Sequence, residues 1–325
     1  MTNLFDTLKK KISSTNKKIV FPEALDERIL TAASKLSMEG ILQPVLIGNE
    51  GAIREKATEL ALDISGCGIV DPNAYANLDV MVNAFVDRRK GKATESDARN
   101  ILRDENYFGT MLIYLNEADG LVSGAVHSTS DTVRPALQII KTKAGMKKTS
   151  GVFIMVREEE KYVFADCAIN ISPDAADLAE IAVESAVTAQ MFDIDPRVAM
   201  LSFSTKGSAK SEETERVIAA LELAKEKNPE LVIDGEFQFD AAFLPSVAKQ
   251  KAPGSVLKGN ANVFIFPSLE AGNISYKIAE RLGGFEAVGP ILQGLNKPVN
   301  DLSRGCSAKD VYKLAIITAT QALAE

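Results

Sequence analysis

Residues 19–48 read IVFPEALDERILTAASKLSMEGILQPVLIG, and this stretch decides the fold class. Two short apolar runs, 19–24 and 44–48, are typical of buried strands, and residues 26–40 between them have the apolar spacing of a helix. We expect further strands at 109–115, 120–126, 151–156, 162–169, 198–204 and 262–267, and further helices at 173–192, at 211–227 and after Ser307. This alternation predicts an α/β fold with largely parallel sheets, in three layers with helices on both faces.

The length and charge of the chain limit what it can be. Its 325 residues are too many for one ordinary core and suit two domains. A chain that is 46% hydrophobic and 25% charged can bury enough apolar surface to be globular. Its net charge of −7 argues against a binder of nucleic acid or of anionic membranes, so we expect neither as a partner. An anionic ligand must meet a local cluster of cations.

The three cysteines, Cys67, Cys167 and Cys306, are widely spaced and form no CxxC motif. They therefore predict neither a disulfide framework nor a cysteine-rich zinc site, and they indicate a reducing compartment. The charged first residues are not followed by the apolar stretch of a signal peptide, and no run approaches the roughly 18 apolar residues of a membrane span. We expect a soluble cytoplasmic protein.

Several catalytic motifs are missing. The chain has one histidine, His127, so HExxH sites and paired-histidine catalysis are excluded, and we expect no metal site. GxxxxGK[ST], GxSxG and GxGxxG are also absent. We interpret His127 as a partly buried structural residue. The chemistry must then rest on Arg, Ser, Thr, Asp and Cys.

The most informative segment is KPVNDLSRGCSAKDVYKLAI, residues 297–316. A glycine-containing loop runs into a helix for which we predict Ser307 as the N-cap, so backbone N–H groups and the positive helix end predict an anion-binding site at Ser303 and Arg304. Arg304 offers a planar fork for two oxygens, and Asp310 leans back toward the same loop from the first helical turn. We expect these three side chains to converge. The alternative is a plain capping box between Ser307 and Asp310.

A second candidate is DGLVSGAVHSTSDTVRPALQ, residues 119–138. It is a strand followed by a hydroxyl-rich turn, with Ser128, Thr129, Ser130 and Arg134 available to an anion. The alternative is an ordinary turn whose hydroxyls bond their own backbone.

Weaker signals come from two other segments and two cysteines. Residues 86–92, VDRRKGK, are a basic run in an acidic protein, and the alternative is a solvated face. Residues 201–213, LSFSTKGSAKSEE, predict a strand, a glycine-containing loop and a helix start, an arrangement typical of phosphate-binding sites. Cys167 reads as a core cysteine, and Cys306, near an arginine and a helix start, is expected to have a lowered pKa.

Taken in order, these segments resemble the phosphate acetyltransferases, or phosphotransacetylases. The resemblance runs through VDRRKGKAT, ADGLVSGAVHSTSDTVRPALQIIKT, FADCAIN, LSFSTKGSAK, DGEFQFDAA, ANVFIFPSLEAGNISYKIAERLGG and GPILQGLNKPVNDLSRG. It implies interconversion of acetyl phosphate plus coenzyme A with acetyl-CoA plus phosphate, coenzyme A being a substrate, no tightly bound cofactor, and a homodimer. It also implies a two-domain fold related to the isocitrate and isopropylmalate dehydrogenases, with the site in the cleft between domains. We place the domains at 1–144 plus 296–325 and at 145–295.

The same resemblance implies roles for particular residues. Ser303, Arg304 and Asp310 fall at the family's catalytic positions, and Arg88 and Arg134 at its substrate-binding arginines. Cys167 falls at an active-site cysteine that need not be the nucleophile, and Ser128 and Thr129 lie in the matched turn. The neighbouring Arg89 leaves the alignment of the first arginine open by one position.

The implied reaction needs a base, because a thiol with pKa about 8.5 is only a few per cent ionised at pH 7. An ordinary aspartate, at about 3.9, could complete the proton transfer in advance only at a cost of about 6 kcal/mol. Asp310 therefore either has a raised pKa in a cleft or takes the proton as the C–S bond forms. We expect the second, in a direct transfer within a ternary complex, because Arg304 nearby should lower the pKa of Asp310. The alternatives are an acetyl group carried on Cys167, a phosphate butyryltransferase, or an NAD(P)-dependent hydroxy-acid dehydrogenase on the same fold.

Overall fold

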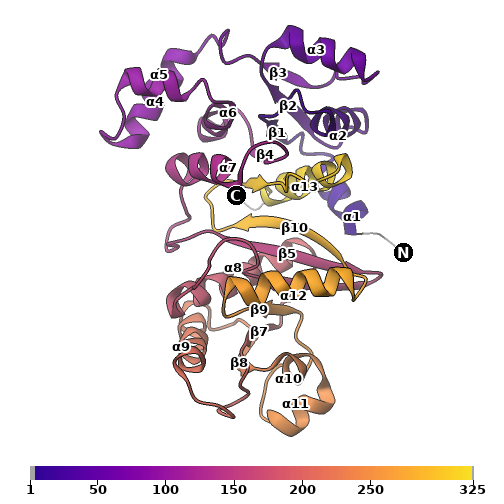
Figure 1. Ribbon diagram of the computed structural model, residues 1–325, viewed down its shortest axis with the longest axis vertical. Helices are drawn as coiled ribbons and strands as arrows, with labels where there is room; N and C mark the ends of the chain where they lie inside the picture. The colour runs from indigo at the N-terminus through magenta and orange to yellow at the C-terminus, as the bar shows by residue number, and fades with distance from the viewer. Residues whose placement is uncertain (1–3, 324–325) are drawn as a thin grey trace. The chain divides into compact units, whose positions relative to one another are not determined.

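The computed structural model describes residues 4–323 and divides the chain into two compact units. The first unit comprises Met1–Lys143 and Leu295–Glu325, and the second comprises Ala144–Gly294. Each unit is built on one sheet with helices packed against it (Figure 1), so the α/β class predicted from the sequence is confirmed. No helix within residues 4–323 combines the length and the apolar character needed to cross a bilayer.

The sheet of the first unit is entirely parallel, as its apolar runs predict. The strand order is β11-β4-β1-β2-β3, with bounds Val299–Asp301, Gly120–Ser123, Lys18–Phe21, Gln43–Ile47 and Gly68–Val70. The helices are α1 (Leu4–Ile12), α2 (Glu27–Met38), α3 (Glu50–Glu59), α4 (Leu78–Arg89), α5 (Glu95–Ile101), α6 (Glu105–Tyr114), α7 (Thr129–Pro135), the π-helix η1 (Ala136–Ile140) and α13 (Ala308–Gln321). The last helix thus returns to the unit in which the chain begins.

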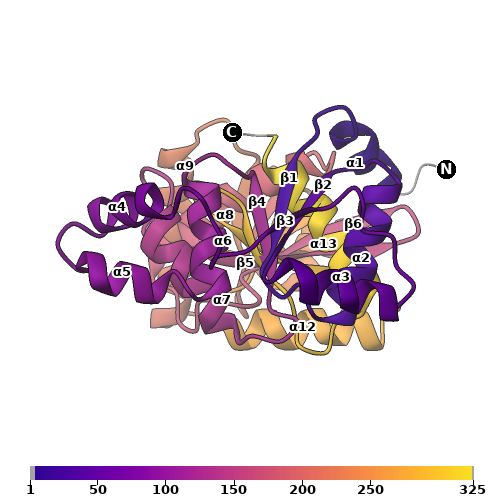
Figure 2. The same cartoon turned by 90° about the horizontal axis from the view of Figure 1, so that it is seen from above.

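Helices cover both faces of this sheet. Seen from above, α6 and α7 lie on one side of strands β1 to β4, and α2 and α13 lie on the other (Figure 2). α13 packs on α1, α2 and β4, and its side chains Val311, Ile316 and Ile317 are fully buried. The helix that begins at the predicted anion loop is therefore anchored in the core.

The strand expected at 109–115 is wrong, because these residues belong to helix α6. Asp104 caps that helix by accepting the backbone N–H groups of Asn106 and Tyr107 at 2.9 and 3.0 Å. The helix is buried on most sides, so its sequence lacks the polar face that would mark it. Gly109 lets α6 approach the sheet, because a Cβ there would lie 2.8 Å from Val20 Cγ1.

The sheet of the second unit is mixed, so the expectation of largely parallel pairing is wrong for part of it. The order is β10-β5-β6-β9-β7-β8, with bounds Glu286–Gln293, Ser150–Arg157, Glu160–Ala165, Val263–Ile265, Val198–Leu201 and Ile233–Phe237. β5 pairs antiparallel with both β6 and β10. For β6 this follows from the connection of only two residues, which is too short for a parallel crossover. The helices are α8 (Ala175–Met191), α9 (Glu212–Lys227), α10 (Phe239–Phe243), α11 (Pro245–Lys251) and α12 (Leu269–Arg281).

Candidate active site

Three strand ends meet at one edge of the first unit. β11, β4 and β1 are neighbours and parallel, so the segments 302–307, 124–128 and 22–26 that follow them leave the sheet at the same edge. Ligands of open α/β sheets bind at such carboxyl edges. The structure thus brings the two loops predicted from the sequence next to each other, and adds a third segment that the sequence did not point to.

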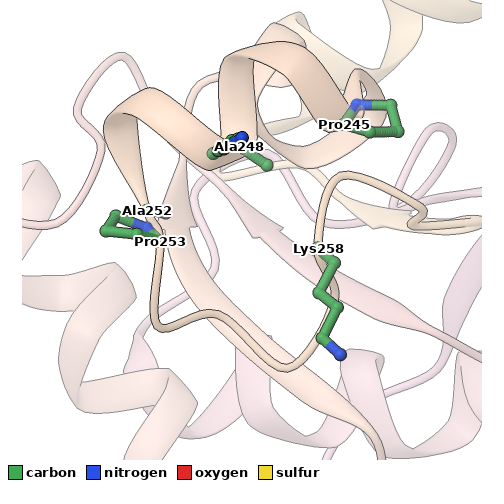
Figure 3. Close-up of a pocket in the computed structure, with 6 residues that line it drawn as sticks. Pro245, Ala248, Ala252, Pro253 and Lys258 are labelled. Carbon is green, nitrogen blue, oxygen red and sulfur yellow. The ribbon is translucent and has the colours of Figure 1, made fainter.

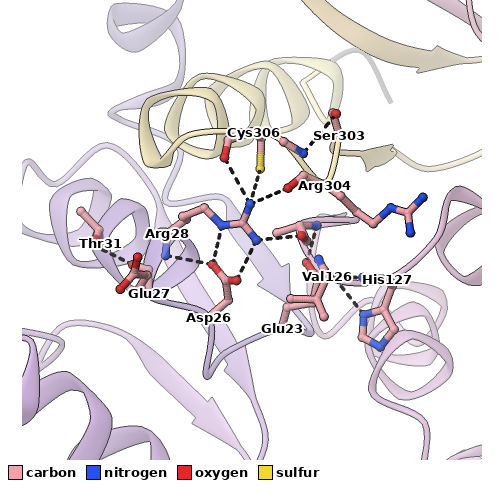
Figure 4. A network of polar contacts seen from close by, with 12 residues as sticks. Glu23, Asp26, Glu27, Arg28, Thr31, Val126, His127, Ser303, Arg304 and Cys306 are labelled. Carbon is pink, nitrogen blue, oxygen red and sulfur yellow. Dashed lines mark hydrogen bonds and ion pairs between the residues drawn. The ribbon is translucent and has the colours of Figure 1, made fainter.

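The loop after β11 carries the guanidinium of Arg304, which makes no hydrogen bond or ion pair with the described residues. Leu302 N–H donates to the carbonyl of Ser123 at 2.7 Å, and Cys306 N–H donates to that of Ser303 at 2.8 Å, which fixes the turn. The Ser303 hydroxyl accepts a weak hydrogen bond from Gly305 N–H at 3.3 Å. The guanidinium of Arg304 extends away from Ser303 (Figure 4) and has no hydrogen bond or ion pair with residues 4–323.

Asp310 forms the capping box considered as the alternative role. Its Oδ2 accepts the N–H and the hydroxyl of Ser307, both at 2.8 Å, and its own N–H donates to Ser307 Oγ at 3.3 Å. No donor within residues 4–323 reaches the other oxygen, Oδ1. The side chains of Ser303, Arg304 and Asp310 are all exposed, and no hydrogen bond or ion pair joins them to one another. They share one loop and helix end without direct contact.

Glu23 holds the turn after β4, a role that the sequence analysis missed. Its side chain is only 1% exposed. It accepts the backbone N–H groups of Ala125, Val126 and His127, each at 2.8 Å, and lies 2.9 Å from His127 Nδ1. A carboxylate directly after a buried strand was the only available signal, and its partners lie more than 100 residues away.

Arg28 was missed as well. It stands in the first turn of α2, and its guanidinium contacts both loops at this edge, through the carbonyls of Ala125 and Arg304 at 2.7 and 2.8 Å (Figure 4). Asp26 pairs with it at 2.8 Å, and hydrogen bonding from Arg28 lowers the pKa of Asp26. The segment 22–28 therefore contacts and supports both candidate loops, 302–307 and 124–128.

The hydroxyls after β4 are partly used in capping. Ser128 is the N-cap of α7 and donates its hydroxyl to Asp131 at 2.7 Å, which lowers the pKa of Asp131. Arg134 donates to Ser130 Oγ at 3.2 Å. Thr129 lies beside the buried carboxylate of Asp301.

Asp301 is a buried acid at the end of β11. Burial raises its pKa to about 6, and the hydroxyls of Thr129 and Thr132 offset only part of that effect. No donor in the described part of the chain reaches its Oδ1. Gly124, with φ of +104°, makes room for this oxygen, since a Cβ there would collide with it. An acid that ionises near neutral pH thus lies under the two loops.

The two arginines of the basic run at 86–92 have different surroundings. Arg88 donates to the carbonyls of Ile139 and Ile140 at 2.5 and 3.0 Å and lies 5.0 Å from the centre of the Tyr114 ring, so it closes the end of η1. The guanidinium of Arg89 has no hydrogen bond or ion pair with residues 4–323. Burial raises the pKa of Tyr107, and the charges of Arg134 and Arg89 oppose that shift, which places the two guanidiniums near one ring.

Neither cysteine singled out from the sequence is an activated thiol. Cys167 belongs to the second unit and is fully buried, and burial followed by the charge of Asp166 raises its pKa well above the ordinary value. The lowered pKa expected for Cys306 is wrong, because burial raises it by more than Arg28 lowers it. Within residues 4–323 no group of three or more His, Cys, Asp or Glu side chains is arranged to hold a metal ion.

The glycine loop of the second unit, residues 202–211, binds a carboxylate side chain of the protein itself. Glu236 is buried, and its Oε1 accepts the Ser204 hydroxyl at 2.7 Å and Gly207 N–H at 2.8 Å. Lys206 Nζ lies 2.5 Å from Asp234 Oδ1. The loop that looked suited to phosphate is thus occupied by carboxylates from β8.

A hollow of about 480 Å³ also lies in the second unit, between α11 and the following loop (Figure 3). It is lined by Pro245, Ala248, Lys249, Ala252, Pro253 and Lys258. None of the residues predicted to take part in catalysis or binding lines it.

Known proteins resemble this chain along its whole length. The family model described as "Phosphate acetyl/butaryl transferase" matches residues 3–319. A phosphate acetyltransferase of Bacillus subtilis (strain 168) is 71% identical over 323 residues, which cover 99% of this chain and 100% of that protein. The crystal structure of a phosphotransacetylase from Streptococcus pyogenes has a TM-score of 0.97 and 60% identity, covering 99% of this chain and 98% of that one.

A more distant structure shares the fold. A branched-chain phosphotransacylase from Enterococcus faecalis V583 has a TM-score of 0.67 at 18% identity, over 94% of this chain and 99% of that one. The family model and the 71% identical relative both match nearly the full chain. This chain therefore belongs to the phosphate acetyl/butaryl transferase family and is an acyltransferase.

Proposed function

We propose that this enzyme interconverts acetyl phosphate plus coenzyme A and acetyl-CoA plus phosphate. The family and the name of the 71% identical relative support this activity. The observation that carries it is the uncommitted guanidinium of Arg304 at the start of α13, where backbone N–H groups and a positive helix end also favour an anion. Coenzyme A is a substrate in this reaction and not a resident cofactor.

The reaction proceeds by direct transfer in this proposal. The coenzyme A sulfur attacks the acyl carbon, the bond from that carbon to the phosphate oxygen breaks, and Asp310 takes the thiol proton as the C–S bond forms. Arg304 offsets the charge that develops on the acyl oxygen and the departing phosphate, and Ser303 hydrogen-bonds at the reacting end. Arg134, with Arg88 or Arg89, orients the phosphate. Of those two, Arg89 is the one whose guanidinium has no hydrogen bond or ion pair within residues 4–323.

The contacts of Asp310 and Cys167 support these roles. Asp310 Oδ2 is engaged by Ser307, so Oδ1 is the oxygen available to a substrate proton. Cys167 is buried and its pKa is raised, and a thiol that stays protonated is a poor nucleophile. A role for Cys167 beside the substrates stays a prediction from the family resemblance.

Two measurements test this proposal. Thioester formation from acetyl phosphate and coenzyme A should be catalysed, and its absence would contradict the activity. Labelled phosphate should not exchange into acetyl phosphate when coenzyme A is omitted, because direct transfer leaves no acetyl-enzyme to return. Robust exchange under those conditions would favour a covalent intermediate. Butyryl phosphate assayed beside acetyl phosphate measures the acyl preference.

We also propose a homodimer through the exposed face of α12. Ile274, Ile278 and Leu282 follow one another at four-residue spacing on this face and are 58%, 53% and 85% exposed. The opposite face is fixed to the sheet, since Tyr276 stacks on Phe153 with ring centres 4.0 Å apart. An apolar stripe on one side of an otherwise anchored helix is typical of a surface that a partner covers.

The charges at the ends of α12 favour a second copy as that partner. Glu270 lies in the first turn and Arg281 in the last, so two antiparallel copies would bring opposite charges together around a two-fold axis. Ile278→Glu should shift the sedimentation of the protein toward the monomer. Val256→Glu, at a position 62% exposed elsewhere in the second unit, should not. A dimer that survives Ile278→Glu would remove α12 from the interface.

A cytoplasmic location completes the proposal. It is supported by three free cysteines, which suit a reducing compartment. Fractionation of cells that express the tagged chain would test it. The absence of nucleic-acid and membrane partners stays a prediction from the net charge.

A further inference from the structure

Arg28 uses every hydrogen-bond donor of its guanidinium. Nε and Nη2 donate to the two carboxylate oxygens of Asp26 at 2.9 and 2.8 Å. Nη2 also donates to the carbonyl of Ala125 at 2.7 Å, and Nη1 to the carbonyls of Arg304 and Cys306 at 2.8 and 3.2 Å (Figure 4). A guanidinium has five N–H donors, and these five oxygens account for all of them.

These contacts set the spacing between two loops. The carbonyls of Arg304 and Cys306 flank the point at which the chain turns from β11 into α13, and Ala125 lies in the turn after β4. Asp26 is the N-cap of α2, and its Oδ1 also accepts the Arg28 backbone N–H at 2.9 Å. Asp26 therefore holds Arg28 by both its guanidinium and its backbone. One planar group therefore fixes where the side chain of Arg304 leaves the backbone.

We propose that Arg28 is a positioning residue for acyl transfer, which holds the loop of Arg304 in place relative to the turn of Ser128 and Thr129. This inference rests on the proposed function of Arg304. Arg28 has no donor left for a substrate, so it acts through the loop. A lysine would keep the charge, but its three donors cannot satisfy five acceptors in a fixed planar arrangement.

A simpler role for Arg28 would be stability alone, and the chain offers a matched control for it. Lys17 Nζ and Asp119 Oδ1 form an ion pair of 2.9 Å just before β1 and β4, which are two of the strands that end beneath Arg28. The Lys17 and Arg28 side chains are similarly exposed, at 22% and 25%. Lys17→Gln thus weakens the same sheet at its opposite edge.

The experiment compares Arg28→Lys, Lys17→Gln, Arg304→Ala and the double variant Arg28→Lys/Arg304→Ala by melting temperature and by steady-state kinetics of thioester formation. We expect Arg28→Lys to lower kcat by about 10- to 100-fold with little change in either KM, because a misplaced group acts on the transition state. Lys17→Gln should lose comparable stability and keep its kcat. In the Arg304→Ala background, Arg28→Lys should cost less than about twofold, because the group it positions is gone.

Asp26→Asn provides a second variant if Arg28→Lys folds poorly. It weakens the hold on the Arg28 guanidinium without changing the loops of Ala125 and Arg304. It should therefore lower kcat by a smaller factor than Arg28→Lys does, with the KM values unchanged. A wild-type kcat in every folded variant of Arg28 and Asp26, or an equal loss with and without Arg304, overturns the inference about Arg28. Full activity of Arg304→Ala contradicts the proposed function instead, so the two failures are distinguishable.

Discussion

The loops 302–307 and 202–211 follow the same pattern of parallel strand, hydroxyls, glycine and capped helix. Ser307 caps α13 through Asp310, and Ser211 caps α9 through Thr214. The difference lies in their charges. In the second unit a buried carboxylate fills the loop and Lys206 is ion-paired, whereas in the first unit the guanidinium of Arg304 has no partner among the residues that the structure describes. A loop of this kind is open to an external anion only where the fold has not supplied an internal one.

The largest expected effect separates the two basic residues of these loops. Arg304→Ala should lower kcat by about 1000-fold, the upper range for removing one group that stabilises developing charge. Lys206→Ala should cost stability, through the lost pair with Asp234, and leave kcat within about threefold. Steady-state assays of both variants, with melting temperatures, check this. A comparable loss of kcat in both would erase the distinction between the loops.

The two caps provide the next test. Asp310→Asn should lower kcat by about 100-fold, since a general base contributes at least that much, while the amide oxygen still accepts from Ser307 and preserves the cap. Thr214→Ala removes the hydroxyl that accepts the Ser211 N–H at 2.9 Å, the equivalent capping contact of α9, and should lower stability without lowering kcat. If Asp310→Asn kept the wild-type kcat, Asp310 would be a helix cap and no more.

The sequence predicted what depends on local patterns. The parallel strands at 19–24 and 44–48, and the cap at Ser307, follow from apolar runs and from capping chemistry, and the structure contains all three. The roles of Glu23 and Arg28 could not be predicted, because their partners in the two loops lie 97 to 278 residues away and depend on the strand order. For the same reason Arg88 could not be told from Arg89, since only the fold brings the η1 carbonyls to one of them.

Asp301, the buried carboxylate under the first loop, should make the stability of the protein depend on pH. Asp301 Oδ1 accepts no hydrogen bond from the residues described, and burial raises its pKa to about 6, so the native state binds its proton more tightly than the unfolded chain does. Its contribution to stability is present below about pH 4 and is lost as the pH rises through 6. Asp301→Asn should therefore gain about 2 kcal/mol relative to wild type between pH 4.5 and pH 8.

Urea unfolding of both proteins at the two pH values measures this gain. Asp195→Asn is the control, because the Asp195 side chain is 92% exposed. A stability difference between wild type and Asp301→Asn that does not change with pH would mean that Asp301 titrates as it does in the unfolded chain.

Glu236 should give a smaller effect of the opposite sign. Its Oε1 accepts two hydrogen bonds, from Ser204 and from Gly207 N–H, so the charged form is satisfied in its buried site. Glu236→Gln keeps the shape and removes the charge that strengthens these bonds, and should destabilise the protein by about 1 kcal/mol at pH 8. Urea unfolding checks the sign directly. If Glu236→Gln were stabilising, the carboxylate would be an unsatisfied charge like Asp301, and the second loop would no longer differ from the first by holding its own anion.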